Sequence, residues 1–151
     1  MSNVEGTTVF EWTPEYSVNI PEIDREHRVL FGTVESLLQA MRAGEGKQRL
    51  GALLAEMIRY TAQHFTREEA FMAAAGFPEL QAHRSQHAEL SSVVLAFQQR
   101  FDRGETTMTI EVMQFLIFWL RRHTTGSDRR FGQFLEAARD RRNAAGNSTR
   151  L

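Results

Sequence analysis

The chain has 151 residues, a formal net charge of −1, 42% hydrophobic and 25% charged residues, and no cysteine. A chain of this size and composition can build one apolar core, and the absence of cysteine excludes disulfides, thiolate metal sites and thiol catalysis. The balanced charge argues against nucleic acid as a partner, and the sequence shows neither a signal peptide nor the roughly 20-residue apolar run that membrane insertion requires, so we expect a cytoplasmic monomer.

Residues 1–20 are predicted to form an irregular arm, which four apolar side chains pack onto the body of the protein: Trp12, Tyr16, Val18 and Ile20. A first helix is predicted over residues 22–41, where apolar residues recur at helical spacing, and Gly44 and Gly46 end it. A second helix is predicted over residues 47–74 for the same reason, and Gly76 closes it.

A third helix is predicted from just after Pro78 to Phe101, and a fourth from Thr107, as its N-cap, to His123. The polar stretch from Thr124 to Ser127 is expected to interrupt the fourth helix, before a shorter segment over residues 128–139. The polar tail, residues 141–151, is expected to fray. Long helices with short connections predict one all-α domain over residues 1–151: an antiparallel up-down-up-down four-helix bundle, about 22–139, with an arm and a short C-terminal helix.

The five histidines are distributed so that every long helix carries at least one. His83 and His87 are four residues apart, so their imidazoles share a helix face and can bind one metal ion from the same side. Taken alone, such a pair is more often a pair of surface or core histidines.

His64 and Glu68 have the same spacing on the second helix. A carboxylate can bridge two metal ions, although a solvated polar pair is the more frequent interpretation of these two residues alone. Glu69 lies about 100° around the helix from Glu68 and is interpreted as an exposed charge.

His123 and Asp128 are five residues apart, which does not fit one face of a straight α-helix. A distortion between them, with Gly126 supplying conformational freedom, would bring both to one centre. Asp128 alone is more simply an N-cap, and His27, flanked by Ile23 and Leu30 at helical spacing, is more simply a core histidine.

In an up-down bundle these positions map to the same end of the molecule. Seven nitrogen and oxygen ligands would then converge in one layer. The simpler interpretations given above would have to hold separately for all four groups of residues, so a shared metal site explains the arrangement better. The ligand types suit iron, manganese or zinc, and do not choose among them.

This ordered set resembles the hemerythrin family, in particular its single-domain bacterial members. The resemblance extends from Trp12 to about Gly132. The stretches that carry it are Ile23-Asp24-x-Glu26-His27, His64-Phe65-x-x-Glu68-Glu69-x-x-Met72, His83-x-x-x-His87, and Trp119-Leu120-x-x-His123-x-x-x-x-Asp128 with Phe131-Gly132.

The resemblance implies two non-haem iron ions joined by an oxo or hydroxo bridge. One iron would be held by His83, His87 and His123 and the other by His27 and His64, with both bridged by the carboxylates Glu68 and Asp128. The two-histidine iron would keep one position open for dioxygen as a ligand. An apolar oxygen pocket is expected over that position, formed by Leu120, Phe31, Phe65, Met72 and Trp119.

The predicted function is therefore reversible dioxygen binding for storage, transport or delivery, with no catalytic residue. Thr124 replaces a large aliphatic residue common in the family, and the polar stretch that it begins is expected to admit water and shorten the life of the oxygenated form. One alternative is an oxygen or redox sensor that acts through a separate protein partner. Another is a di-iron oxidase or peroxidase, which the absence of a Glu-x-x-His motif makes the weaker alternative.

Overall fold

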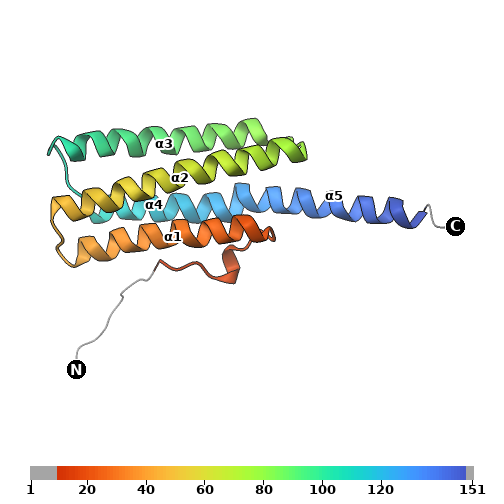
Figure 1. Ribbon diagram of the computed structural model, residues 1–151, viewed down its shortest axis with the longest axis horizontal. Helices are drawn as coiled ribbons and strands as arrows, with labels where there is room; N and C mark the ends of the chain where they lie inside the picture. Colours follow the sequence, from red (N-terminus) through yellow and green to blue (C-terminus); the bar gives the residue numbers. More distant parts are fainter. Residues whose placement is uncertain (1–9, 149–151) are drawn as a thin grey trace, which may run out of the picture.

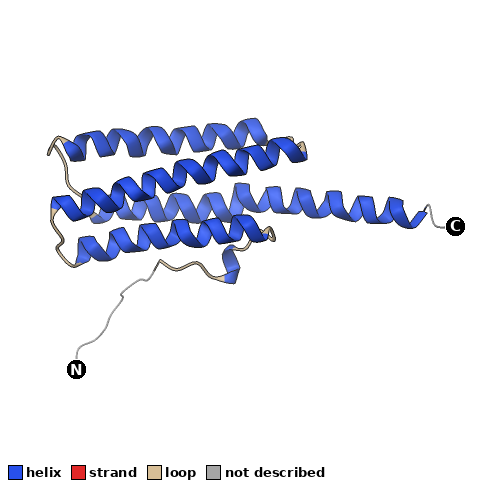
Figure 2. Cartoon of the chain, in the orientation of Figure 1, coloured by secondary structure: helices blue, strands red, loops and turns tan. Residues whose placement is uncertain are grey.

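A computed structural model describes residues 10–148 of the protein. Over these residues the chain is helical, with no strand (Figure 2). The helices are α1 (Pro21–Arg42), α2 (Lys47–Ala75), α3 (Leu80–Asp102), α4 (Ile110–His123) and α5 (Arg129–Ser148). A 3-10 turn, η1 (Pro14–Tyr16), lies in the arm, and a π-helical turn, η2 (Thr124–Asp128), joins α4 to α5. No helix in the described part is both long and apolar enough to cross a bilayer.

The first four helices form the predicted antiparallel bundle (Figure 1). The helix α1 contacts α2 and α4, and α2 contacts α3. Two left-handed glycines close the turns, Gly44 after α1 with φ 71° and Gly76 after α2 with φ 69°. The all-α bundle expected from the helical periodicity is confirmed.

The apolar interior falls into two clusters of buried side chains. The large cluster fills most of the bundle and includes Leu30, Phe65, Leu90 and Leu120. The small cluster lies at the end of the bundle where α1 begins, and consists of Val18, Ile20, Ile23, Met72, Phe77 and Phe131. On α1, Ile23 of the small cluster and Leu30 of the large cluster flank His27, and on α2, Phe65 and Met72 flank Glu68 in the same way, so a polar layer lies between the two apolar cores.

The fourth helix differs from the prediction at both ends. It begins at Ile110, and its N-cap is Thr109, whose Oγ1 accepts a hydrogen bond from Val112 N (3.3 Å), rather than Thr107. The side chain of Met108 is buried in the large cluster, which requires extended backbone before the helix can start. At the other end the helix is not interrupted, because η2 carries it into α5 as one rod that extends beyond the bundle (Figure 1).

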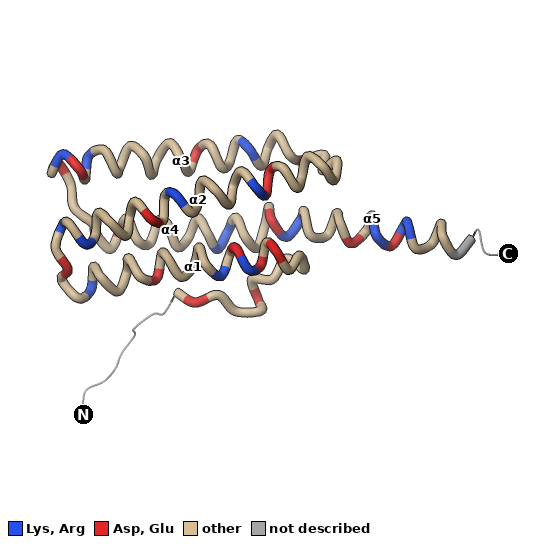
Figure 3. The backbone as a smooth tube through the Cα atoms, in the orientation of Figure 1, with Lys and Arg blue, Asp and Glu red and all other residues tan. Residues whose placement is uncertain are grey.

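The expected short last helix and frayed tail are also corrected. The helix α5 does not end near residue 139 but continues to Ser148, and only residues 149–151 of the predicted tail lie outside the described part. Alanines and charged residues of both signs, which favour a solvated helix, fill this segment (Figure 3). Gly126 does not supply unusual freedom either, since the described glycines with positive φ are Gly44, Gly76 and Gly104.

The arm is fixed to the bundle from Phe10 onward, while residues 1–9 of the predicted arm lie outside the described part. Asp24, in the first turn of α1, accepts hydrogen bonds from Ser17 Oγ (2.6 Å) and Val18 N (2.9 Å). A β-carbon added at Gly132 of α5 would lie 2.0 Å from the carbonyl oxygen of Val18. Glycine at this position therefore allows the arm to lie directly against α5.

Candidate metal centre

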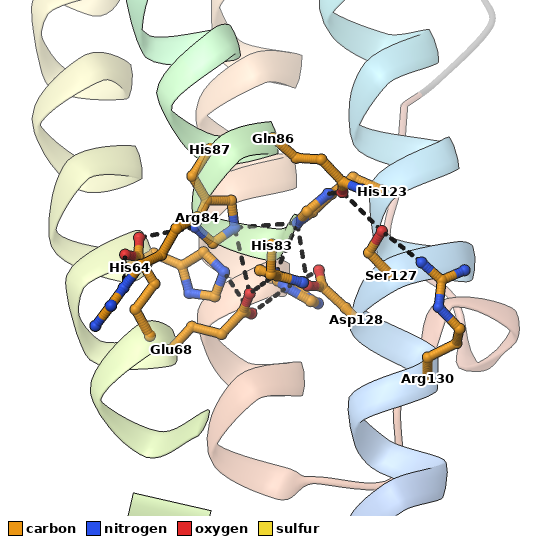
Figure 4. A network of polar contacts seen from close by, with 12 residues as sticks. His64, Glu68, His83, Arg84, Gln86, His87, His123, Ser127, Asp128 and Arg130 are labelled. Carbon is orange, nitrogen blue, oxygen red and sulfur yellow. Dashed lines mark hydrogen bonds and ion pairs between the residues drawn. The ribbon is translucent and has the colours of Figure 1, made fainter. Parts of the chain in front are cut away.

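The seven predicted ligands come from the four helices of the bundle and from η2, and they meet in the polar layer. His27 comes from α1, His64 and Glu68 from α2, His83 and His87 from α3, His123 from the end of α4, and Asp128 from η2. Their exposed fractions lie between 1% and 7%, although all are ionisable. Figure 4 shows six of them, from α2, α3, α4 and η2, pointing toward one another. Buried ionisable groups in such number require mutual partners or a bound cation.

Glu68 divides its two carboxylate oxygens between two sets of histidines. Its Oε1 lies 2.6 Å from His83 Nε2 and 3.4 Å from His87 Nε2. Its Oε2 lies 3.2 Å from His64 Nε2 and 3.7 Å from His27 Nε2. The carboxylate thus stands between a pair on α3 and a pair from α1 and α2.

Asp128 divides its oxygens in the same way. Its Oδ1 lies 2.9 Å from His83 Nε2 and 3.1 Å from His123 Nε2, while its Oδ2 lies 3.1 Å from His27 Nε2. The π-helical turn makes this possible, because i→i+5 bonding places residues five apart on one face. His123 and Asp128 are the first residue before η2 and its last residue, so the predicted distortion exists as an extra residue in the turn rather than as a bend.

The donor atoms are arranged for cations rather than for hydrogen bonds with one another. The Nε2 atom of His123 lies 3.1 Å from Nε2 of both His87 and His83, so nitrogen lone pairs converge. Two buried oxygens, Glu68 Oε2 and Asp128 Oδ1, lie within 3.2 Å of imidazole nitrogens but make no hydrogen bond of good geometry with them. Neighbouring ligands of a six-coordinate ion with bonds of about 2.1 Å are about 3 Å apart, which is the spacing found here. The residues therefore fit two ions, one for each set of histidines.

The outward-facing nitrogens of three histidines have partners that were not among the predicted site residues. His64 Nδ1 donates to Glu26 Oε1 and His87 Nδ1 donates to Glu69 Oε2, each over 3.0 Å. His123 Nδ1 lies 3.0 Å from Gln86 Oε1. The interpretation of Glu69 as an exposed charge was therefore wrong: it also pairs with Arg84 Nε (3.2 Å), and its side chain is only 23% exposed.

In the metal-free protein, the carboxylates and imidazoles shift one another's protonation. Burial opposes the charged form of His27, but Asp128 and Glu68 outweigh burial and raise the pKa of His27 to about 10. The pKa of His83 rises to about 9 through the same carboxylates, again against burial. Burial acts to raise the pKa of Glu68 and Asp128, but the surrounding imidazoles hold the pKa of each below its usual value. The layer without metal is thus a cluster of mutually stabilised charges.

The five residues expected to form an apolar pocket are divided between the two cores. Phe65 stacks on His87 with ring centroids 3.6 Å apart, and Trp119 stacks on His123 at 4.4 Å. Phe31 and Leu120 are buried in the same large cluster, whereas Met72 belongs to the small cluster on the opposite side of the polar layer.

A cavity of about 210 Å³ lies in the large core and extends to Leu120. Of the five predicted pocket residues, Leu120 alone lines it. The other lining residues had been considered only as core or not at all: Leu30, Val34, Met57, Ile58, Thr61, Ala62, Leu90, Ser91, Val94, Leu95 and Leu116. These residues belong to α1, α2, α3 and α4, so the cavity lies between the four helices of the bundle.

The buried histidines and carboxylates inside a helical bundle are compatible with a metal site, so the fold and the site together are those of a helical-bundle metal-binding protein. The sequence model of the hemerythrin HHE cation binding domain matches residues 18–135. The chain belongs to the hemerythrin family, as its motifs indicated.

Similar proteins cover most of this chain. The bacteriohemerythrin of Methylococcus capsulatus is 29% identical over 127 residues, which are 83% of this chain and 96% of that protein. The bacteriohemerythrin of Clostridium acetobutylicum is 26% identical over 127 residues, 82% of this chain and 98% of that protein. A crystal structure of wild-type hemerythrin superimposes with a TM-score of 0.76 at 29% identity, and the match covers 82% of this chain and 95% of that chain.

Proposed function

We propose that this protein binds dioxygen reversibly at a pair of non-haem iron ions, as a single domain that stores, transports or delivers oxygen rather than transforming it. In this proposal His83, His87 and His123 hold one ion, His27 and His64 hold the other, and Glu68 and Asp128 bridge them. The family and the fit of the donor atoms support iron at these positions.

The observation that carries the proposal is the division of both carboxylates between unequal sets of histidines. Glu68 and Asp128 each direct one oxygen to the three-histidine set and the other to the two-histidine set. The second set therefore supplies one protein ligand fewer. A metal position with an incomplete set of protein ligands is where an external ligand binds.

Held by these residues, a pair of ferrous ions would supply the two electrons needed to bind dioxygen reversibly. The chain itself contributes the environment of that exchange. Leu120 lies one turn before His123 and lines the apolar cavity, so a small apolar gas can approach the layer through side chains that water does not favour. Phe65 and Trp119 cover the imidazoles of His87 and His123, which limits solvent at the three-histidine side.

The test is to load the protein with iron, measure its iron content, reduce it without air, and record the visible spectrum as oxygen is admitted and then removed. We expect two irons per chain and a coloured band that appears with oxygen and disappears when oxygen is removed. Two irons per chain that oxidise irreversibly in air would contradict reversible oxygen binding and would favour a sensor or an oxidase. A chain that takes up no iron would overturn the assignment of the seven ligands.

A further inference from the structure

His123 is connected to the surface by a chain of hydrogen bonds that begins at a neutral amide, whereas the outer partners of His64 and His87 are carboxylates. Arg130 Nη2 donates to Ser127 Oγ (3.2 Å), Ser127 Oγ donates to Gln86 Oε1 (2.7 Å), and Gln86 Oε1 lies 3.0 Å from His123 Nδ1. Figure 4 shows this chain running from α5 across η2 to α3. At its outer end, Arg130 Nε pairs with Glu79 Oε1 (3.4 Å).

The atoms at each contact set the direction of the chain, because Gln86 presents its carbonyl oxygen Oε1 to both Ser127 and His123. A guanidinium only donates, so the oxygen of Ser127 accepts from Arg130 and its hydroxyl hydrogen is free to point at Gln86. The group of Gln86 that receives this hydrogen is then the carbonyl oxygen, not the amide nitrogen. That same oxygen faces His123, which must therefore carry its hydrogen on Nδ1 and turn the lone pair of Nε2 toward the centre.

The chain differs from the other outer partners in charge but not in distance. The Nδ1 atoms of His64, His87 and His123 all lie 3.0 Å from an oxygen of another helix. For His64 and His87 that oxygen belongs to a carboxylate, of Glu26 and Glu69, whereas for His123 it belongs to a neutral amide. A carboxylate partner makes an imidazole a stronger donor to a metal ion, and a neutral amide orients the ring without doing so.

We propose that Gln86, Ser127 and Arg130 are positioning residues that fix the orientation of His123 while withholding negative charge from it, and so keep the reduction potential of the three-histidine ion high. The electronic part of this proposal rests on the proposed iron centre. The proposal also explains why a polar side chain is buried in η2: Ser127, which is 8% exposed, links Arg130 of α5 to Gln86 of α3.

The orientation of His123 is tested by nuclear magnetic resonance of the metal-free and zinc-loaded protein. In the wild type, the Nδ1–H of His123 should exchange slowly with solvent in both forms. Ser127→Ala removes the hydroxyl that holds Gln86, so this exchange should accelerate, and zinc should be lost to a chelator about 10-fold faster. Ser127→Thr should restore both rates because it restores the hydroxyl.

Thr125→Ala is the matched control, because it removes an exposed hydroxyl from the same turn, where Thr125 Oγ1 donates to Arg121 O (2.7 Å) away from the chain. It should behave as the wild type does. If Ser127→Ala also keeps the wild-type exchange and zinc-release rates, the positioning role is overturned.

The electronic role is tested by two reciprocal substitutions in the iron-loaded protein. Gln86→Glu places a carboxylate behind His123, and Glu69→Gln removes one from behind His87, with little change in shape. The reduction potential should fall in the first variant and rise in the second. Potentials equal to that of the wild type in both variants would overturn the electronic role.

These results are separable from those that test the proposed function. A wild-type protein without iron or zinc would overturn the proposed centre, and the proposal about reduction potential with it. The exchange of the His123 Nδ1–H in the metal-free protein would still decide whether Gln86 and Ser127 position this ring.

Discussion

Each histidine with a described outer partner is held from two sides: Nε2 faces the centre, and Nδ1 faces a side chain of another helix. Glu26 on α1 holds His64 on α2, Glu69 on α2 holds His87 on α3, and Gln86 on α3 approaches His123 on α4. The orientation of each of these three imidazoles therefore depends on the register between two helices, and their hydrogen bonds connect α1 to α2, α2 to α3 and α3 to α4.

The carboxylate that faces four histidines should be indispensable for metal binding. Replacing Glu68 by alanine leaves neither set of histidines with its oxygen and removes the link between them, so Glu68→Ala should hold less than one metal ion per chain. Elemental analysis of protein reconstituted with iron would measure this. Glu56→Ala, an exposed carboxylate on the same helix, should retain two ions. Full iron content in Glu68→Ala would contradict the bridging role.

The side chain at the inner end of the cavity should control oxidation without controlling metal content. Leu120→Ala should keep two irons but, after exposure to air, convert several-fold faster to a form that does not release oxygen, because water gains access to the layer. The substitution should also cost about 2–5 kcal/mol of stability, as buried leucine truncations do. Leu116→Ala lines the same cavity one turn farther from His123, so it should lose comparable stability without faster oxidation.

Acidity should have opposite effects on the metal-free fold and on metal binding. The raised pKa values of His27 and His83, about 10 and about 9, stabilise the metal-free fold fully below the unfolded pKa of about 6.5, and this contribution is lost as pH rises through them. The lowered pKa values of Glu68 and Asp128 contribute above about 4.5 and are lost toward acid. Thermal unfolding of the metal-free protein should therefore show greatest stability between about pH 4.5 and 6.5.

Metal binding competes with the same protons. At pH 7 the raised pKa values of His27 and His83 keep both imidazoles protonated in the metal-free protein, and the pKa of His64 is raised as well, so zinc binding should release at least two protons and strengthen as pH rises. Calorimetry in buffers with different ionisation enthalpies counts these protons. A count near zero at pH 7 would mean that the metal-free imidazoles are neutral.

The seven inward-facing residues could be predicted from sequence because spacing along a helix decides which side chains share a face. The four-residue spacings on α2 and α3 needed no knowledge of the neighbouring helices. The outer partners Glu26, Glu69 and Gln86 were not predicted, because each acts on a histidine of a different helix. The one local signal was that Glu26, Glu69 and Gln86 are each next in sequence to a ligand.

At the scale of the helix, the five-residue turn η2 is what brings α4 and α5 into one site. An uninterrupted α-helix would place Asp128 about 140° around the helix axis from His123. The sequence indicated a distortion from the spacing alone but not its kind, because a break, a bend and a π turn leave the same five-residue separation. The extension of α5 to Ser148 was not predicted, because the polar composition of residues 141–148 indicated a frayed tail, whereas the alanines in this segment favour a helix.

The length of η2, not its glycine, should be essential. A β-carbon at Gly126 would meet no atom within 4 Å, and its φ is not positive, so Gly126→Ala should keep two metal ions and gain about 0.5–1 kcal/mol of helix stability. Insertion of one alanine after Thr125, which lengthens the separation of His123 and Asp128 to six residues, should instead turn Asp128 out of the layer and abolish binding of the metal pair. Metal content and thermal unfolding measure both. Metal loss in Gly126→Ala would show that the glycine, rather than the turn length, is required.

At the scale of the whole molecule, the arm completes the end of the bundle that the helices leave open. Val18 and Ile20 supply part of the small cluster, and Gly132 lets the arm lie against α5. The sequence predicted that the arm packs through these apolar residues, but not which helix receives it. Contact between segments more than a hundred residues apart has no local signal.

The contact at Gly132 should be intolerant of any side chain. Gly132→Ala places a β-carbon 2.0 Å from the carbonyl oxygen of Val18, so backbone must move and the fold should lose about 1–3 kcal/mol. Urea unfolding measures the loss, and limited proteolysis should cut the arm faster. Gly32→Ala, a helical glycine with nothing within 4 Å of an added β-carbon, should be neutral or slightly stabilising. Equal stability in the two variants would show that the arm readily moves aside.

The polar layer between the two apolar cores has a consequence for cooperativity. The small core contains six buried apolar side chains from the arm, α1, α2, α5 and the turn before α3, and it meets the large core only across the ionisable groups. Without metal, that boundary is held by ion pairs, so the small core can open while the large core persists. If the proposed two ions are bound, residues of α1 to α4 and of η2 would share coordination bonds across the boundary, and the two cores should unfold together. Metal loading would then couple the opening of the small core to that of the whole bundle.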